Sequence, residues 1–373
     1  MHFLLSCGGT GGHLSPGISL AEGLMARGHT ATLLISRKKV DSRLLEKYPN
    51  LRFERMPGRG FSWRPIRLAL CVASQLQAVV FCVRLIARSR PDAIIGFGGF
   101  TSAPVVLAGR LGRVPVALHE SNRIPGLAIR TLGRFATRVY LPPGIRLSSV
   151  GAAATRQVGL PVRQEIVRLN RAESRSALGL EVGPKVLAIL GGSQGAATFN
   201  AWARTQVPAL AAEGVQVYCL TGLDKGQAEV RELKSRTGAT VKVIFAPFCD
   251  RMAELLSAAD LVVSRAGSGT LAELIRCETP AILVPFPYSA DNHQRANAAF
   301  FERQGGGLVV EQSRMATLQA EVLESIFNDW LLRKFRGNLR RMDRANSLDL
   351  MIRDLENLTG SPASPSAPTF VPA

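Results

Sequence analysis

The sequence predicts an α/β protein made of two doubly wound domains, each with a parallel sheet covered by helices on both faces. Three observations support this fold class. The 373 residues, 46% of them hydrophobic, are enough for two cores of ordinary size. Short β-rich apolar runs alternate with helical patterns along the chain, which is typical of parallel sheets. Glycine and proline at 158–161 interrupt both periods and indicate a domain junction.

The expected elements follow the same order in both halves. Strands are expected at 2–7, 31–36, 92–96 and 115–119, and again at 186–190, 215–221, 241–246, 260–264 and 281–285. Helices are expected at 16–27, 65–88, 102–112 and 125–135, and again at 195–210, 225–236, 250–257, 270–277 and 292–304. Open parallel sheets bind ligands at the carboxyl ends of their strands, so the site is expected in the loops that follow these strands.

These elements divide into an N-terminal domain at 1–158 and a C-terminal domain at 159–330. A charged helical pattern follows, and we expect the segment 331–358 to form helices that pack back on the N-terminal domain. The tail at 359–373 is rich in proline, serine and alanine and is expected to be disordered.

The net charge of +18 is distributed unevenly. Residues 1–160 hold 22 basic and 6 acidic residues, whereas 161–373 hold 24 and 22. This asymmetry predicts an anionic partner for the first half. A nucleic-acid-binding protein is disfavoured, because only 6% of residues are aromatic and basic runs interleaved with aromatics are missing from the sequence.

The chain shows neither a disulfide pattern nor a targeting segment. Its six cysteines have no CxxC spacing, and several stand in apolar runs where cysteine is usually a small buried hydrophobe, so neither a disulfide framework nor a zinc site is expected. Residues 2–7 are too short for a signal peptide, and the apolar stretch 68–83 is interrupted by Ser74, Gln75 and Gln77. We therefore expect a cytoplasmic protein without a transmembrane helix. The apolar segment 63–90 has basic residues at its ends and is expected to rest on an anionic membrane, or else to be a core helix with an arginine-rich edge.

Three glycine loops follow predicted strands, at 8–13, 96–102 and 191–196. Glycine lets backbone N–H groups converge on an anion, and a following helix adds a favourable dipole. Together the loops predict phosphate-bearing ligands in a cleft between the domains. A dinucleotide fingerprint fits the first loop poorly, because Leu14 stands where its third glycine belongs; an NADP site using Arg37 remains an alternative.

Two further segments extend this pattern. In 264–273 a strand runs into a helix that Ser268 and Thr270 could cap, and Glu273 lies where a carboxylate could accept hydrogen bonds from ribose hydroxyls. In 285–297 Asp291 is the expected N-cap of a helix that begins with His293 and Gln294. The alternative is that these residues only cap helices and complement their dipoles.

Six motifs, taken together, resemble the MurG family of glycosyltransferase family 28. These enzymes transfer N-acetylglucosamine (GlcNAc) from UDP-GlcNAc to the membrane-bound acceptor lipid I, undecaprenyl-pyrophosphoryl-MurNAc-pentapeptide, to form lipid II in peptidoglycan synthesis. The motifs are GGTGGH at 8–13, GFGGF at 96–100, HESN at 119–122, GGSQGA at 191–196, SRAGSGTLAEL at 264–274 and DNHQRANA at 291–298. The resemblance implies a GT-B fold, with the acceptor bound by the N-terminal domain and the nucleotide sugar by the C-terminal domain.

The resemblance also implies the site. The donor-binding positions are Thr10, Gly11, Gly12, Asn122, Arg163, Ser193, Gln194, Cys249, Ser268, Gly269, Thr270, Glu273, His293 and Gln294. The acceptor-binding positions are Gly9, His13, Gly98, Gly99 and Phe100. Arg163 would bind the diphosphate and Glu273 the ribose, while backbone groups of Cys249 would read uracil.

The implied reaction inverts the anomeric centre, with His13, Glu120 and Asn122 as catalytic positions. His13 is either the general base or a group that orients the acceptor diphosphate; His119 and Glu120 are weaker candidates for the base. The sequence has no Asp-x-Asp pair, so we expect neither a metal nor a cofactor.

The expected partners are UDP-GlcNAc, lipid I, the cytoplasmic face of the inner membrane and other cell-wall synthesis proteins, with roles in cell shape and division. An alternative is another GT-B UDP-sugar transferase with a different acceptor. The sequence departs from the family pattern at Phe100, Ala103, Ser121, Ile129 and Leu160. These departures concern the acceptor side more than the donor side.

Overall fold

The computed structural model describes residues 1–8, 11–36, 47–58, 65–192, 197–223, 225–343 and 347–360. The chain forms two compact units. The first unit comprises 1–121, 125–163 and 345–373, and the second comprises 122–124 and 164–344. The first unit therefore continues to Arg163, past the expected boundary at 158, and contains the end of the chain.

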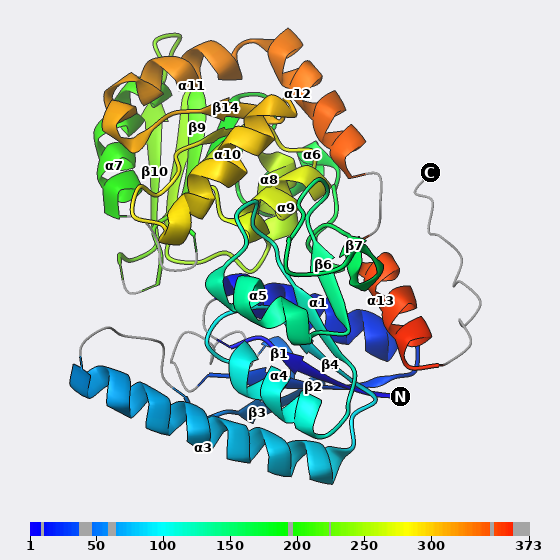
Figure 1. Ribbon diagram of the computed structural model, residues 1–373. Helices are drawn as coiled ribbons and strands as arrows, with labels where there is room; N and C mark the ends of the chain where they lie inside the picture. The colour runs from blue at the N-terminus through cyan, green and yellow to red at the C-terminus, as the bar shows by residue number, and fades with distance from the viewer. Residues whose placement is uncertain are drawn as a thin grey trace. The chain divides into compact units, whose positions relative to one another are not determined.

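In the first unit, seven of the described strands form a parallel sheet in the order β3-β2-β1-β4-β5-β6-β7 (Figure 1). The strands are β1 (His2–Ser6), β2 (Thr30–Ile35), β3 (Arg52–Arg55), β4 (Ala93–Gly96), β5 (Val116–His119), β6 (Arg138–Leu141) and β7 (Thr155–Gln157). The order reverses between β1 and β4, so the loops after these two strands flank the topological switch point, where doubly wound sheets bind ligands.

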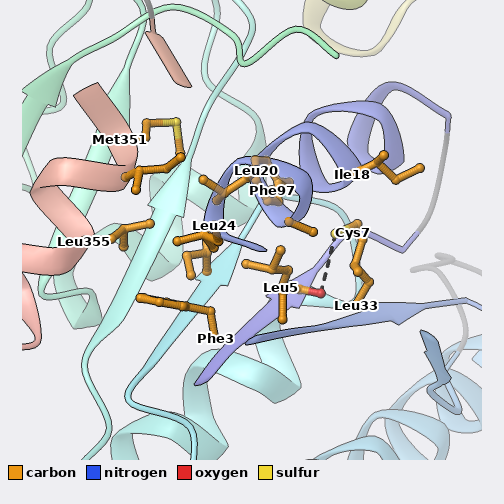
Figure 2. Packing of buried hydrophobic residues seen from close by; sticks show 14 of the residues in the cluster. Phe3, Leu5, Cys7, Ile18, Leu20, Leu24, Leu33, Phe97, Met351 and Leu355 are labelled. Atoms are coloured by element: carbon orange, nitrogen blue, oxygen red, sulfur yellow. Dashed lines mark hydrogen bonds between the residues drawn. The ribbon is translucent and has the colours of Figure 1, made fainter. Parts of the chain in front are cut away.

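Helices cover both faces of this sheet. On one face α1 (Gly11–Ala26) and α13 (Ser347–Leu358) pack over Phe3 and Leu5, as Figure 2 shows. On the other face α3 (Pro65–Ser89), α4 (Ser102–Leu111) and α5 (Leu127–Leu132) pack over Leu4 and Ile94. Successive residues of β1 thus enter opposite cores, as the period of two in a strand requires. The 3₁₀ turns η2 (Gly133–Phe135) and η3 (Ala152–Ala154) precede β6 and β7.

Helix α13 is attached to the first unit by charge as well as by apolar packing. The buried carboxylate of Glu356 accepts hydrogen bonds from Arg27 at 3.1 Å and His29 at 3.0 Å. Arg27 also pairs with Asp349 at 2.8 Å. A buried carboxylate is tolerated because these partners satisfy it.

The second unit has its own sheet, in the order β10-β11-β9-β8-β12-β13-β14 among the described strands. The strands are β8 (Lys185–Leu190), β9 (Val215–Leu220), β10 (Glu229–Lys234), β11 (Thr240–Ala246), β12 (Leu261–Ser264), β13 (Ala281–Leu283) and β14 (Gly307–Val309). All neighbouring pairs are parallel except β10 with β11.

The helical segments of this unit are α6 (Arg171–Ala177), α7 (Ala197–Ala212), α8 (Met252–Ala258), α9 (Ser268–Arg276), η4 (Ala290–Asn292), α10 (His293–Arg303), η5 (Gln312–Thr317), α11 (Leu318–Ile326) and α12 (Asp329–Met342). Phe199 and Trp202 of α7, with Val322 of α11 and Leu332 of α12, pack over one face of the sheet. This second core, like the first, is the one expected for a doubly wound domain.

Two expectations about the second half are wrong. The segment 225–236, expected to be helical, contains β10, which pairs antiparallel with β11. Its Glu, Arg and Lys residues favour helices, but Val230 and Leu233 pair across to β11 through a turn in which Gly238 has φ +80°. In 331–358 only α13 lies in the first unit; α12 belongs to the second, where Leu332 enters its core.

Short or polar elements were not among those expected: β3, β6, β7, β14, α6 and α11. Helix α1 begins at Gly11, upstream of its expected start at Pro16. Pro16 therefore lies inside the helix, where it cannot donate the backbone hydrogen bond to Gly12. All six cysteines are free and buried.

The packing of α13 predicts unequal effects for two of its leucines. Leu355 is fully buried and Leu350 is 44% exposed. We expect Leu355→Ala to lower the free energy of unfolding by about 2–4 kcal/mol, because it leaves a cavity, and Leu350→Ala by less than about 0.5 kcal/mol. Chemical denaturation of the full chain measures both, and equal losses would contradict this placement of α13.

Candidate functional site

The loops after β1 and β4 meet at the carboxyl edge of the first sheet. The Thr101 hydroxyl donates a hydrogen bond to the Gly8 carbonyl at 3.1 Å. A Cβ on Gly8 would lie 2.6 Å from the Thr101 methyl and 2.8 Å from the Ser36 nitrogen, so only glycine fits. The predicted residues Gly9 and Thr10 lie outside the described residues.

The second loop presents its backbone to His13. Gly98 and Gly99 have φ values of +95° and +74°, a region that side chains disfavour. A Cβ at Gly99 would stand 3.3 Å from the His13 ring. The Ser102 hydroxyl holds the loop by donating to the Gly98 carbonyl at 2.8 Å, and Phe100 is half-buried beside it. The structure therefore brings together three predicted acceptor residues, His13, Gly98 and Gly99.

Gly11 and Gly12 form the first turn of α1, directly before His13. The first turn of a helix has backbone N–H groups without partners in the helix, and its dipole favours a negative charge. The start of α1 thus offers backbone groups that favour an anion.

The pair His119–Glu120 at the end of β5 is buried and fully engaged. His119 is 1% exposed, and its Nε2 donates to the Gly159 carbonyl at 3.1 Å. Burial, with a smaller contribution from the nearby His13, lowers the pKa of His119 from 6.5 to about 4. The Glu120 carboxylate accepts from the backbone N–H groups of Ser121 at 2.9 Å and Gly126 at 2.7 Å. Both side chains hold the loop in place, which favours a positioning role over proton transfer.

Arg163 is the last residue of the segment 125–163 of the first unit. Its guanidinium donates to the Tyr48 hydroxyl at 3.5 Å, and the side chain is half-buried. Of the family departures, Ile129 is buried in the core beneath α3 and α4, where an apolar residue is appropriate.

In the second unit, the chain passes from β12 into α9 through Arg265, Ala266 and Gly267. Gly267, which has no side chain, is the N-cap, so the expectation that Ser268 or Thr270 holds this position is wrong. The N-terminal amides of a helix such as α9 favour an anion. Glu273 is half-buried in the second turn of the same helix.

Arg265 was not among the predicted site residues. It is buried, and it donates to the Val284 carbonyl at 3.0 Å and to Gln312 at 2.7 Å. Its guanidinium also stacks on Phe199 at 4.6 Å and Phe286 at 5.4 Å. Arg265 thus connects the start of α9 to the loop after β13. Its position directly after a predicted strand was the sequence signal that could have identified it as a residue of the site.

The loop before α10 has a strained backbone. Asp291 and Asn292 have φ values of +49° and +56°, and Asn292, not the predicted Asp291, is the N-cap. The Gln294 side chain accepts from the Phe286 N–H at 2.9 Å, and His293 Nδ1 lies 2.6 Å from the Ala290 carbonyl. His293 and Gln294, the two predicted sugar-contact residues, therefore also hold this loop in place.

Asn297, a second residue not predicted, connects Asn122 to this region. Its side chain accepts from the Arg123 N–H at 2.9 Å and donates to the Asn122 side chain and the Ala266 carbonyl, both at 3.1 Å. It lies one turn after His293 and Gln294 on the same helix, a spacing that could have suggested it. Asn122 is thus held next to the start of α9.

Cys249 follows β11 and is buried, and burial raises the pKa of its thiol. The role of the Cys249 backbone in uracil recognition stays a prediction. Gly192 of the third loop has φ +82°, whereas Ser193 and Gln194 lie outside the described residues. Within the described ranges, no group of three His, Cys, Asp or Glu side chains is placed to hold a metal.

Two doubly wound domains of this kind form the GT-B fold. The sequence matches the glycosyltransferase family 28 N-terminal domain over residues 3–141 and the C-terminal domain of the same family over 186–338. The chain belongs to this family, which confirms the predicted family and fold class.

Two similar proteins with the same name cover almost the whole chain. The chain is 62% identical over 372 residues, 99% of each chain, to a UDP-N-acetylglucosamine--N-acetylmuramyl-(pentapeptide) pyrophosphoryl-undecaprenol N-acetylglucosamine transferase of Opitutus terrae. It is 33% identical to the same-named protein of Geotalea uraniireducens, over 95% of this chain and 98% of the other. The solved structure of Acinetobacter baumannii MurG matches with a TM-score of 0.72 at 23% identity, covering 95% and 99% of the two chains.

The burial of His119 predicts a pH dependence of stability. Its pKa of 6.5 in the unfolded chain falls to about 4 in the fold, so the unfolded state binds the proton first as the pH falls between these values. Stability is therefore lost as the pH falls from about 6.5 to about 4, by about 3 kcal/mol from this group.

Comparison with His119→Gln isolates this contribution, because glutamine can donate to Gly159 without titrating. Urea unfolding at several pH values should show a shallower acid loss for the variant. Identical pH profiles for the two proteins would show that His119 titrates normally.

Proposed function

We propose that this protein transfers N-acetylglucosamine from UDP-GlcNAc to lipid I, forming lipid II. The observation that supports it best is the near-complete similarity to a relative named for this transfer, 62% identical over 99% of the chain. The start of α9 at Gly267 fits the diphosphate of such a donor, because the N-terminus of a helix favours an anion.

In this proposal the second unit binds the donor. The α9 amides at Ser268–Thr270 bind the diphosphate, and the Glu273 carboxylate accepts hydrogen bonds from the ribose. His293, Gln294 and Asn122 contact the sugar. Arg265 and Asn297 are positioning residues, because they hold the loops that bear these groups.

The acceptor hydroxyl oxygen attacks the anomeric carbon, the bond from that carbon to the diphosphate oxygen breaks, and UDP leaves. In this proposal His13, which is half-buried over Gly98 and Gly99, takes the proton of the attacking hydroxyl. The amides around the diphosphate stabilise the charge that develops on it.

We further propose that α3 rests on the membrane that holds the acceptor. One of its faces, with Ala78 and Cys82, is in the core, and the other exposes Val72, Leu76 and Val80. The segment Leu70–Ser89 is long and apolar enough to cross a membrane by length and composition, and 28% of it is buried in the fold. The buried face favours a helix that lies on the surface, with exposed Arg84 and Arg88 toward anionic lipid.

The donor assignment predicts the effect of Glu273→Gln. Losing a charged acceptor of two ribose hydrogen bonds should raise the KM for UDP-GlcNAc about tenfold or more and leave kcat nearly unchanged, because the ribose does not react. Transfer of labelled GlcNAc to lipid I in detergent measures both constants. Glu232→Gln, an exposed glutamate on β10, is the control. A fall in kcat at constant KM would contradict the ribose role, and no transfer by the parent protein would reject the function.

The membrane assignment predicts weaker vesicle binding for Leu76→Gln/Val80→Gln. These side chains are 63% and 50% exposed, and removing their apolar area should lower partitioning onto phosphatidylglycerol vesicles about tenfold. Val182→Gln/Val230→Gln, which changes two exposed valines of the second unit, is the matched control. Equal partitioning of the two variants in a sedimentation assay would contradict contact through α3.

A further inference from the structure

Helix α12 has an outer face made of basic residues and one aromatic. Its apolar residues Leu332, Phe335 and Leu339 are buried. The residues that alternate with them and remain exposed are Trp330, Arg333, Lys334, Arg340 and Arg341, which we call the α12 face. The spacing of three and four places them on one side of the helix.

Positive charge is concentrated on this face although the second half of the chain is nearly neutral. Within 329–342, all of which the structure describes, Asp329 is the one acidic residue beside Arg333, Lys334, Arg336, Arg340 and Arg341. Asp329 forms an ion pair with Lys185. The nearby Asp343 pairs with Arg276 at 2.8 Å. Asp329 and Asp343 are paired with basic residues outside the α12 face, so the charge of the face itself stays positive.

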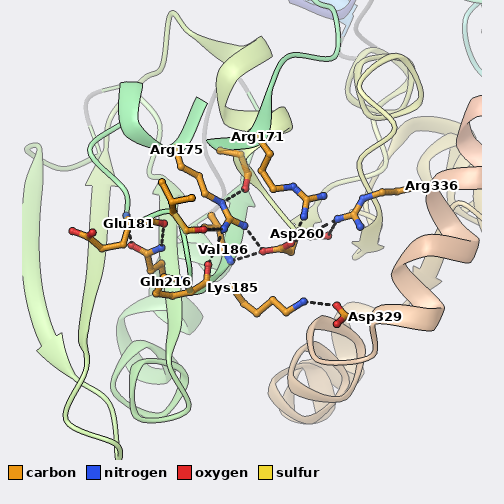
Figure 3. Close-up of polar contacts among 12 residues, drawn as sticks. Arg171, Arg175, Glu181, Lys185, Val186, Gln216, Asp260, Asp329 and Arg336 are labelled. Carbon is orange, nitrogen blue, oxygen red and sulfur yellow. Dashed lines mark hydrogen bonds and ion pairs between the residues drawn. The ribbon is translucent and has the colours of Figure 1, made fainter. Parts of the chain in front are cut away.

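Two carboxylates, Asp260 and Glu278, hold guanidinium groups of α12 and of the segment 168–175. Asp260 is 2% exposed and pairs with Arg171 at 3.0 Å and with Arg175 at 2.6 Å, while Arg336 approaches at 3.8 Å (Figure 3). Burial lowers the pKa of Arg336 to about 10, and repulsion from Arg171 contributes. More positive than negative charge is thus gathered around Asp260, in an ordered arrangement.

Glu278 fixes the other end of the face. It accepts two hydrogen bonds from Arg340, both at 2.9 Å, and it also pairs with Arg168. Arg168 and Arg171 extend the basic surface beside α12. Because an arginine has five N–H donors, a guanidinium fixed by one carboxylate can still bind a second. Holding these side chains in place reduces the entropy lost when a ligand binds.

Trp330 gives the face an aromatic anchor. Its side chain is 62% exposed, Lys334 lies 4.9 Å from its ring, and Phe327 is exposed just before the helix. Exposed tryptophan next to arginine is the composition of residues that dominate protein–protein binding energies.

The chemistry of the face favours a protein partner over lipid. The face that α3 exposes is apolar, with Val72, Leu76 and Val80 on one side of the helix, as insertion into a bilayer requires. On α12 the apolar side is occupied by the core, and the fixed guanidinium groups match the geometry of carboxylates. We propose that the α12 face docks an acidic segment of a partner protein.

The test uses the full chain and a fluorescein-labelled helical peptide of glutamate and alanine, with a glutamine and alanine peptide as the neutral probe. Arg333→Glu/Lys334→Glu should weaken binding of the acidic peptide about tenfold at an ionic strength of about 0.15 M, measured by fluorescence anisotropy. Trp330→Ala should weaken it about fivefold with no change in charge. Lys234→Glu/Arg236→Glu, at the exposed end of β10, changes the charge equally and should leave binding nearly unchanged.

Three results would overturn the proposal. An equal loss in both double variants would assign binding to the general positive charge of the chain. Equal binding of the neutral peptide would remove the charge argument. Loss of phosphatidylglycerol-vesicle or oligothymidine binding in the α12 variant, with peptide binding intact, would assign the face to lipid or nucleic acid. Transfer to lipid I by each variant checks that the fold is intact, and none of these outcomes depends on the assigned donor site.

Discussion

Backbone N–H groups at the carboxyl edges of the two parallel sheets are the feature on which the account of this protein depends. All strands of a parallel sheet end at one edge, so the loops after them converge there without any special device. Glycine at 98 and 99 lets the backbone turn through left-handed conformations, and Gly267 is the N-cap of α9. The resulting anion sites use the peptide groups themselves, which keep the same charge distribution at any pH where the protein is folded.

Most of the polar side chains around these loops hold the backbone in place. Glu120 closes a turn by accepting two N–H groups, and Asn297 joins Asn122 to the start of α9. Arg265 stacks between aromatic rings while donating to carbonyl and amide oxygens. Buried polar groups of this kind are tolerated when each is satisfied, and they specify one loop geometry. Their loss should therefore disturb substrate binding through the loops they support.

The fold class and most of the long helices and strands could be predicted from the sequence, because they depend on local periodicity. The segments that carry His13, Gly98 and Glu273 could also be located, because each stands in or directly after a glycine-containing loop. It failed where tertiary contacts decide. The 229–234 segment has helix-favouring charges but becomes a strand because β11 offers it a partner. The capping roles of Ser268 and Asp291 were wrong because cap geometry depends on φ and ψ of the preceding loop. The sequence positions of Asn297 and Arg265 were available signals, but only contacts across the fold show which loops these residues hold.

The central claim is that backbone amides of this fold bind the diphosphate of UDP-GlcNAc. The most direct test is the thermal unfolding midpoint in EDTA, measured with UDP-GlcNAc, UDP-GalNAc, UDP-glucose or NADPH. We expect UDP-GlcNAc to raise the midpoint most, because it is the proposed donor. A ligand at about 100 times its Kd stabilises a fold by about 2.7 kcal/mol. No rise with any UDP-sugar would contradict the claim, and a rise with NADPH alone would assign the first glycine loop to a dinucleotide.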